Sequence, residues 1–312
     1  MKKYIIFLLM LITVSFNTAI AQQKVTRISD VVYQHKDGMA FVFDMIRPAK
    51  QNGAAILYIL SGGWVSRDAA NISTSSYKSY TDKGYTVFII SHGSQPRYNV
   101  PEIFSQVQRA IKFIRYNAGR YGIDPAKLGI MGHSAGGHLS VSAAVFGKDA
   151  MTEAEYRKEY DIPKDNKIDS IDLISSKIQA VACFYPPTNF IQYNSPDSNW
   201  FDFPKVRNVS ANGSFIATPD SSRDFQNKTL KSISPYYFIT ENTPPVLIIH
   251  GTDDGLVPYS QSVSLITELK AHHVPCMLIA KEGKDHGWPY EKADENACLN
   301  WFDKYLLKGT LK

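Results

Sequence analysis

Short, unbroken apolar runs recur through this chain, and segments with helical periodicity separate them. The runs lack the alternation of polar and apolar residues that marks a strand with one face in water. An unbroken run of this kind is typical of a strand buried on both faces of a parallel sheet, because helices cover both sides of such a sheet. We therefore predict strands at residues 54–60, 86–90, 128–131, 178–185, 245–250 and 274–280.

The segments between these runs predict the connecting helices. In residues 100–116, Ile103, Val107, Ile111 and Ile114 recur at a spacing of three or four residues, which places them on one helix face. Similar segments lie at residues 135–146, 260–271 and 293–307. Alternating strands and helices require right-handed crossovers, so the fold class predicted is α/β, with a mostly parallel, doubly wound sheet.

Three segments fall outside this alternation. Residues 25–33 and 40–46 are rich in strand-forming residues and flank Lys36-Asp37-Gly38, which predicts an N-terminal antiparallel hairpin. Residues 147–177 and 188–232 are long enough that we expect lid-like insertions over the carboxyl edge of the sheet. We see no linker or internal repeat, so residues 22–312 are predicted to form a single domain.

Residues 1–21 have the pattern of a secretory signal peptide. Lys2 and Lys3 precede an apolar run at residues 4–14, and Ala19-Ile20-Ala21 supplies small residues for cleavage. The run is too short to cross a bilayer about 30 Å thick, so we expect an exported protein, periplasmic or secreted, without an integral membrane span. Loss of two lysines lowers the formal net charge from +5 to +3, which is too small to predict a nucleic-acid partner.

A candidate nucleophile follows the predicted strand at residues 128–131. Gly132-His133-Ser134-Ala135-Gly136 is a Gly-x-Ser-x-Gly motif between a predicted strand and a predicted helix. Glycines permit a sharp turn there, which exposes the Ser134 hydroxyl at the positive end of the helix. The motif also occurs by chance, and Ser134 as a simple helix cap is the alternative.

A serine hydroxyl needs a base that a carboxylate orients. Asp253 and Asp254 follow the strand predicted at residues 245–250, and His286 follows the last predicted strand. The order Ser134, Asp254, His286 is one of the known chain orders of a catalytic triad. Alternatively, Asp254 only forms a turn and His286 is an ordinary loop residue. Further histidines near strand ends suit packing or hydrogen bonding: His92, His133, His138 and His250.

The reaction also needs hydrogen-bond donors for a negatively charged oxygen. The Ala135 N–H is one candidate, and Gly62 and Gly63 can supply others, because glycine lets the main chain approach a substrate closely. A strand-to-helix turn is the alternative for the glycines. Aromatic side chains form a possible substrate pocket, or else pack a lid onto the body: Trp64, Tyr193, Trp200 and Trp288.

No pattern in the sequence predicts a cofactor or a metal site. The acidic residues between Asp161 and Asp172 lack the ligand spacing and the glycine of a calcium loop. Cys183, Cys276 and Cys298 are few and odd in number, so we expect packed thiols, with a single disulfide as the alternative.

Taken together, these motifs resemble the α/β-hydrolase superfamily, in the esterase/lipase branch with bacterial feruloyl-, acetylxylan- and carboxylesterase-like proteins. The resemblance covers nearly all of residues 40–307 and is most specific at residues 121–140. It extends to residues 184–188, 232–235 and 250–258. It implies the α/β-hydrolase fold, a family acid at Asp254, no cofactor, and a small-molecule or carbohydrate ester as substrate.

Two departures from that family bear on the site. The family's His-Gly-Gly-Gly-Trp loop reads Leu60-Ser61-Gly62-Gly63-Trp64, and His92-Gly93-Ser94-Gln95-Pro96-Arg97-Tyr98 replaces a common Tyr-Arg-Leu. The same triad also serves arylformamidases and peptidase-type amide hydrolases, which remain alternatives within the fold. A catalytically silent binding protein with this fold is the alternative from another class. The sequence does not indicate an oligomeric state.

Overall fold

The computed structural model describes residues 24–203, 222–289 and 291–308. The predicted signal peptide lies outside these residues, as does part of the second insertion. None of the helices within the described ranges combines the length and the apolar character needed to cross a membrane.

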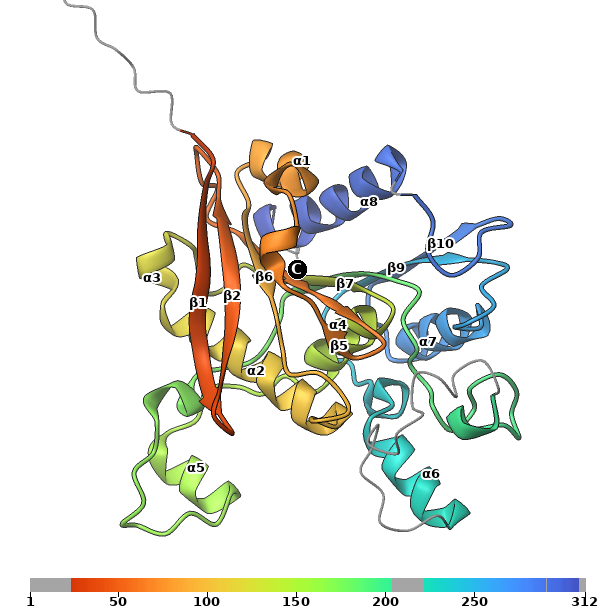
Figure 1. The fold of residues 1–312 in the computed structure, drawn as a ribbon. Helices are drawn as coiled ribbons and strands as arrows, with labels where there is room; N and C mark the ends of the chain where they lie inside the picture. Colours follow the sequence, from red (N-terminus) through yellow and green to blue (C-terminus); the bar gives the residue numbers. More distant parts are fainter. Residues whose placement is uncertain (1–23, 204–221, 290, 309–312) are drawn as a thin grey trace, which may run out of the picture.

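An eight-stranded sheet forms the centre of the fold, in the order β1-β2-β6-β3-β7-β8-β9-β10 (Figure 1). β2 pairs antiparallel with β1 and with β6, whereas β6, β3, β7, β8, β9 and β10 pair parallel. The strands are β1 (Thr26–Lys36), β2 (Met39–Arg47), β3 (Ala55–Ile59), β6 (Thr86–Ile90), β7 (Leu128–His133), β8 (Ala180–Phe184), β9 (Val246–Gly251) and β10 (Cys276–Lys281). The predicted parallel sheet and N-terminal hairpin are confirmed.

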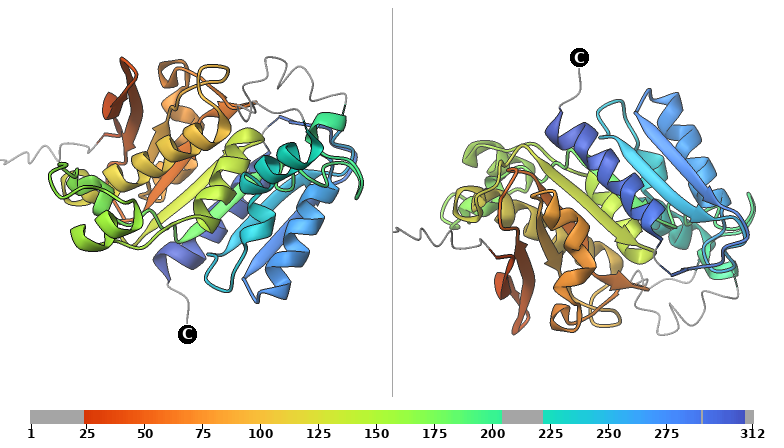
Figure 2. Two further views of the ribbon diagram at one scale, coloured as in Figure 1. Left: turned by 90° about the horizontal axis from the view of Figure 1, so that it is seen from below. Right: turned by 90° about the horizontal axis from the view of Figure 1, so that it is seen from above.

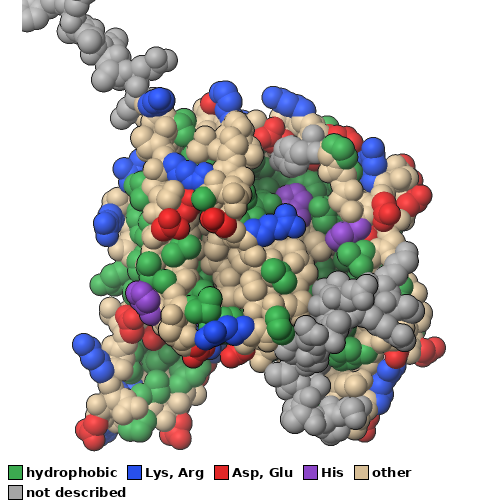
Figure 3. Space-filling model, viewed as in Figure 1, with side chains coloured by type: hydrophobic (Ala, Val, Ile, Leu, Met, Phe, Trp, Pro, Cys, Tyr) green, Lys and Arg blue, Asp and Glu red, His purple; other side chains and the backbone are tan. Residues whose placement is uncertain are grey.

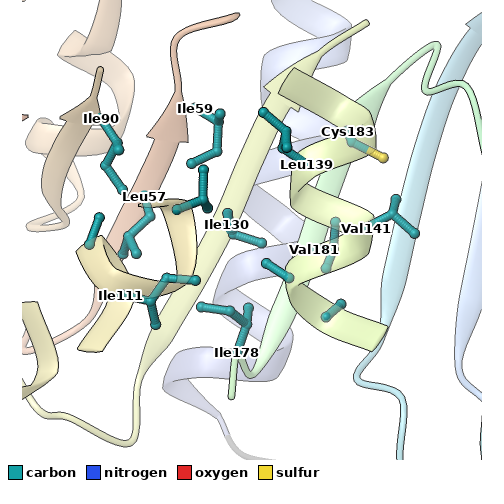
Figure 4. Close-up of a cluster of buried hydrophobic side chains, with 14 of the residues drawn as sticks. Leu57, Ile59, Ile90, Ile111, Ile130, Leu139, Val141, Ile178, Val181 and Cys183 are labelled. Carbon is teal, nitrogen blue, oxygen red and sulfur yellow. The ribbon is translucent and has the colours of Figure 1, made fainter. Parts of the chain in front are cut away.

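Helices cover both faces of the sheet (Figure 2). One layer contains α2 (Val100–Tyr116), α4 (Ala135–Val145) and α7 (Ser260–Ala271), and the other contains α1 (Lys78–Asp82) and α8 (Lys292–Phe302). Successive strand residues point to opposite faces. Ile130 therefore packs with Ile111 of α2 and Leu139 of α4 (Figure 4), while its neighbour Met131 belongs to the cluster around Phe302 of α8.

The shorter elements are mostly ones that the sequence patterns did not reveal. They are β4 (Ser61–Gly62), β5 (Val65–Ser66), α3 (Ala118–Tyr121), α5 (Glu153–Glu159), α6 (Arg223–Ser232) and the 3-10 turns Ala69–Asn71, Thr74–Tyr77, Ser170–Leu173, Trp200–Asp202 and Pro235–Phe238. The last predicted helix, residues 293–307, is divided into α8 and a π-helical turn at Asp303–Leu307.

The insertion at residues 147–177 does not lie where we predicted. It joins the end of α4 to the start of β8, and both lie at the amino edge of the sheet, opposite the carboxyl edge. Arg109 of α2 pairs there with Asp169 and Asp172, and Arg115 donates to the carbonyl of Lys177. The prediction was wrong because apolar patterning does not say at which edge a connection runs. The second insertion follows the carboxyl end of β8, as expected.

Candidate active site

Ser134 lies at a sharp turn between β7 and α4. Its φ of 53° and ψ of −120° are unusual for a residue with a side chain and are strained. Its N–H donates to the Phe184 carbonyl of the adjacent β8 at 2.9 Å, which helps to fix the turn. The hydroxyl is therefore presented at the N-terminus of α4, beyond the carboxyl edge of the sheet.

Two glycines allow this turn to pack tightly. A Cβ added to Gly132 would lie 2.6 Å from the carbonyl carbon and oxygen of Gly136. A Cβ on Gly136 would lie 2.6 Å from the carbonyl oxygen of Ile59 in β3. Both obstacles are backbone atoms, so neither position accepts a side chain unless the strand or the helix moves.

Three side chains that are remote in the sequence form one hydrogen-bonded line. His286 Nε2 is 3.0 Å from Ser134 Oγ, and His286 Nδ1 is 2.8 Å from Asp254 Oδ2. Ser134 follows β7, Asp254 follows β9, and His286 follows β10. The distances are those of direct hydrogen bonds, so an imidazole stands where it could accept the serine proton while a carboxylate holds its other nitrogen.

Asp254 is buried and accepts several hydrogen bonds. Its side chain is fully buried, and Oδ1 accepts the N–H groups of Leu256 and Val257 at 2.9 and 2.8 Å. Burial by itself raises the pKa of the carboxyl. Hydrogen bonds from His250 and His286 outweigh that effect, so the pKa of Asp254 lies well below its ordinary value. The group is therefore a carboxylate at neutral pH.

His250 is a second histidine on the same carboxylate. Its Nε2 lies 3.2 Å from Asp254 Oδ2 and 3.0 Å from the Val257 carbonyl oxygen, so this nitrogen carries a proton and donates it. Its Nδ1 lies 2.6 Å from Ser262 Oγ. The sequence indicated packing or hydrogen bonding for His250 but not its partner. Its position at the end of β9, four residues before Asp254, could have indicated that the two side chains meet.

A cavity of about 400 Å³ opens beside Ser134. The described residues that line it are Tyr58, Leu60, Ser61, Gly62, Gly63, Trp64, Arg67, His133, Ser134, Tyr185, Pro187, Tyr193, Trp200, Leu256, Val257, His286 and Gly287. Figure 3 shows histidine side chains within a hollow on one face of the molecule.

Three of the predicted pocket aromatics line this cavity. Trp64, Tyr193 and Trp200 are at most 2% exposed and pack edge to face, with the Trp200 ring centroid 5.6 Å from that of Trp64 and 4.7 Å from that of Tyr193. The Tyr193 hydroxyl donates to the Leu256 carbonyl at 3.0 Å. These residues thus form a wall of the cavity and also attach the second insertion to the body.

Trp288, the fourth predicted pocket residue, does not appear among the described residues that line the cavity. Its indole N–H donates to Asp294 Oδ2 of α8 at 2.9 Å, and Lys281 binds the other carboxylate oxygen at 2.8 Å. Its ring packs against Tyr185, with centroids 5.3 Å apart. Trp288 therefore anchors the loop that carries His286, because its ring and its indole N–H are held by Tyr185 and Asp294.

Gly62 and Gly63 line the cavity in a tight hairpin between β4 and β5. Gly63 and Trp64, its central residues, both have positive φ, of 58° and 57°, as a two-residue hairpin of the type I′ class requires. Gln95 donates from its side chain to the Gly63 carbonyl and from its N–H to the Trp64 carbonyl. Segment 92–98, which departs from the family pattern, thus anchors this loop.

Ala135, the remaining candidate donor, is the first residue of α4. The N–H of a first helical residue has no partner within its own helix, so it is free to point toward the cavity. Which N–H groups contact an oxyanion stays a prediction.

The three other histidines near strand ends, His92, His133 and His138, are buried or partly buried and do not belong to this line. His138 is buried, accepts the Trp64 indole N–H at Nδ1 and donates from Nε2 to the Ile233 carbonyl. Burial lowers the pKa of His92, His133 and His138 to about 4. His133 lines the cavity and stacks on Phe184, with ring centroids 4.3 Å apart.

The described part of the chain contains no group of three or more histidine, cysteine or acidic side chains that could hold a metal ion. Cys183, Cys276 and Cys298 are free thiols, so the alternative of a disulfide is wrong.

Comparison with known proteins finds a family whose model matches most of this chain. The family model described as BD-FAE matches residues 43–269. Esterase LipC of Mycobacterium tuberculosis is 25% identical over 217 residues, which cover 69% of this chain and 48% of that protein. Endo-1,4-beta-xylanase B of Butyrivibrio fibrisolvens is 27% identical over 222 residues, covering 70% and 30% respectively. The chain thus spans half or less of the length of these curated relatives.

Solved structures agree on the fold. A structure described as a truncated form of carbohydrate esterase from gut microbiota matches with a TM-score of 0.72 and 26% identity, over 91% of this chain and 98% of that chain. An acetyl ester-xyloside bifunctional hydrolase from Caldicellulosiruptor lactoaceticus matches with a TM-score of 0.67 and 22% identity, over 88% and 95%.

Proposed function

This chain belongs to the BD-FAE family, in the esterase branch of the α/β-hydrolases, and from that premise we propose that it is a serine hydrolase that cleaves carboxylic esters. The observation that carries the proposal is the hydrogen-bonded line from Ser134 through His286 to Asp254, beside a cavity. Each member follows a different strand of the sheet, so the line depends on the whole fold.

In the proposed reaction, Ser134 Oγ attacks the ester carbonyl carbon while His286 Nε2 takes the hydroxyl proton. The N–H groups of Ala135, Gly62 and Gly63 stabilise the negative oxygen of the tetrahedral intermediate. The tetrahedral intermediate then collapses and the bond to the alcohol oxygen breaks. His286 gives its proton to that oxygen, the alcohol leaves, and the acyl group remains on Ser134 as an acyl-enzyme. A water molecule, deprotonated by His286, attacks the acyl group, and its proton returns to Ser134 as the acid leaves.

Asp254 keeps its charge throughout. It holds the proton of neutral His286 on Nδ1, so that Nε2 is free to accept, and it stabilises the imidazolium that forms. The low pKa of Asp254 supports this role, because a protonated carboxyl could not do either.

A carbohydrate ester is the substrate class that we propose. A xylanase and a carbohydrate esterase among the similar proteins support it, and so does the cavity, whose wall of aromatic side chains suits the apolar face of a sugar or an acyl group. Hydrolysis of acetylated xylan fragments, compared with simple acyl esters, tests this point.

We also propose that the protein is exported, since residues 1–21 have the composition of a signal peptide. Expression with and without these residues, followed by fractionation, tests it. Retention of both forms inside the cell would contradict export.

The decisive experiment is Ser134→Ala. Turnover of para-nitrophenyl acetate should fall by about 10⁴-fold or more, and labelling by a fluorophosphonate probe should be lost. Ser105→Ala is the matched control, because this exposed hydroxyl on α2 bonds only its own helix. Substantial turnover by a folded Ser134→Ala variant would refute the proposal. A formamide and an anilide assayed in parallel distinguish ester from amide hydrolysis, and a wild-type protein that binds esters without turnover would indicate a silent binding protein.

A further inference from the structure

One permanently charged side chain lines the active-site cavity among the described residues, and it is a cation. Arg67 is exposed at the cavity wall, and no described Asp or Glu side chain lines the same space. Asp254 lies behind His286, where its carboxylate is fully buried and already accepts four hydrogen bonds. The space beside Ser134 therefore has a positive charge that no described acid in its lining balances.

Arg67 is held close to the reaction centre. It follows β5 directly, and the Ser91 hydroxyl donates to its backbone carbonyl at 3.0 Å. Its Nη2 would lie only 3.5 Å from a Cβ built on Gly62, so the guanidinium stands over the proposed oxyanion loop. It also lies near Tyr58: burial raises the pKa of the Tyr58 hydroxyl, and the positive charge of Arg67 offsets part of that rise.

The guanidinium itself has no partner among the residues that the structure describes, since none of them forms a hydrogen bond or an ion pair with it. The adjacent Asp68 does not pair with it; its Oδ1 instead accepts the Ala70 N–H at 2.8 Å as the cap of the next turn. Four of the nine described arginines differ in that each pairs with a carboxylate: Arg27, Arg109, Arg157 and Arg223. Arg67 thus keeps all its donors for a ligand.

We propose that Arg67 binds a carboxylate of the substrate, so that the preferred substrates are esters that also carry a free acid group. This inference rests on the proposed function, and it narrows the substrate class. A guanidinium binds a carboxylate through two parallel hydrogen bonds. A single arginine matches the single charge of a carboxylate, whereas a doubly charged phosphate would need a second cation, and the described lining has no other permanent one.

The acid group can lie on either side of the scissile bond. On the alcohol side it would be the carboxylate of an acylated uronic acid. On the acyl side it would be the second carboxylate of a dicarboxylic half-ester. In both, the charged group must reach Arg67 while the ester carbonyl lies at Ser134 and the loop of Gly62.

Two matched substrate pairs distinguish these sources. An O-acetylated methyl glucuronoside is compared with an O-acetylated methyl glucoside, and para-nitrophenyl hemiglutarate is compared with para-nitrophenyl pentanoate. For each pair, the ratio of kcat/KM for the acidic ester to that for the neutral ester is measured with the wild type, Arg67→Ala, Arg67→Lys and Arg120→Ala. Arg120 is the control, because it is an exposed arginine on α3 that does not line the cavity.

We expect the wild type to favour the acidic member of at least one pair. Arg67→Ala should lower that ratio by about 10- to 100-fold, which is typical for loss of a charged hydrogen bond, and Arg67→Lys should retain part of it. Added salt should reduce the ratio for the wild type, because the site is open to solvent. Arg120→Ala should leave the ratio unchanged. Whichever pair responds identifies the side that bears the acid.

A ratio near one in both pairs, or a preference that a folded Arg67→Ala variant keeps, would overturn the inference while the esterase assignment stands. If the wild type hydrolyses no member of either pair and Ser134 is not labelled by a fluorophosphonate, the proposed function itself fails, and this inference fails with it.

Discussion

Replacing Asp254 by asparagine removes one charge from the site with little change in shape. In the wild type, Oδ1 accepts two backbone N–H groups and Oδ2 accepts N–H groups from His250 and His286. The asparagine has only one acceptor oxygen, so its NH₂ group must face either the two imidazoles or the two backbone donors. Backbone N–H groups can only donate, whereas an imidazole can carry its proton on either nitrogen, so we expect the NH₂ group to face the imidazoles. His286 must then present its unprotonated Nδ1 and carry its proton on Nε2, where it cannot accept the Ser134 proton.

The expected cost follows from this wrong tautomer. Loss of the correctly oriented base in a serine triad lowers kcat by about 10⁴-fold, which corresponds to about 5 kcal/mol of transition-state stabilisation. KM should change much less, because Asp254 is buried behind His286 and does not line the cavity.

The assay is initial-rate hydrolysis of para-nitrophenyl acetate, with thermal unfolding to show that each variant folds. Asp253→Asn is the matched control: this neighbouring side chain accepts a hydrogen bond from Thr252 and contacts neither histidine in the described structure. It should stay within about twofold of the wild type. A folded Asp254→Asn variant with more than about a tenth of the wild-type kcat would refute the role assigned to Asp254.

Two further predictions concern stability. Gly136→Ala should destabilise the fold by about 1–3 kcal/mol and lower kcat, because its Cβ would meet the Ile59 carbonyl. The control is Gly119→Ala, whose Cβ meets nothing within 4 Å and which should not destabilise the fold in this way. Equal urea midpoints for the two variants would contradict the prediction. Lowering the pH from about 6.5 to about 4 should reduce the free energy of unfolding, because the unfolded state protonates His138 at its ordinary pKa while burial lowers the folded pKa to about 4. His138→Gln should flatten that dependence in urea titrations, and an unchanged slope would contradict the assignment.

The local part of this structure could be predicted from sequence. Apolar runs located the parallel strands, because a strand buried on both faces has no polar positions. The turn at Ser134 was also predictable, since two glycines around a serine between a strand and a helix satisfy a steric requirement that the structure shows directly. The carboxyl ends of the parallel strands then indicated Asp254 and His286 as its partners.

What the sequence could not supply was the relation between segments that no short pattern connects. The insertion at residues 147–177 was placed at the wrong edge, and Trp288 was assigned to the pocket although it anchors the loop of His286. The contact of His250 with Asp254 was not foreseen, and nothing singled out Arg67.

The difference between the features that the sequence predicted and those that it did not has a physical basis. Periodicity and glycine sterics act over a few residues, so the sequence alone determined the main strands of the sheet, the longer helices and the sharp turn at Ser134. Distances such as 3.0 Å between Ser134 and His286 depend on how helices and strands pack across the sheet. Only the tertiary structure decided which side chains share the cavity, which carboxylate is paired, and which cation is left for a ligand.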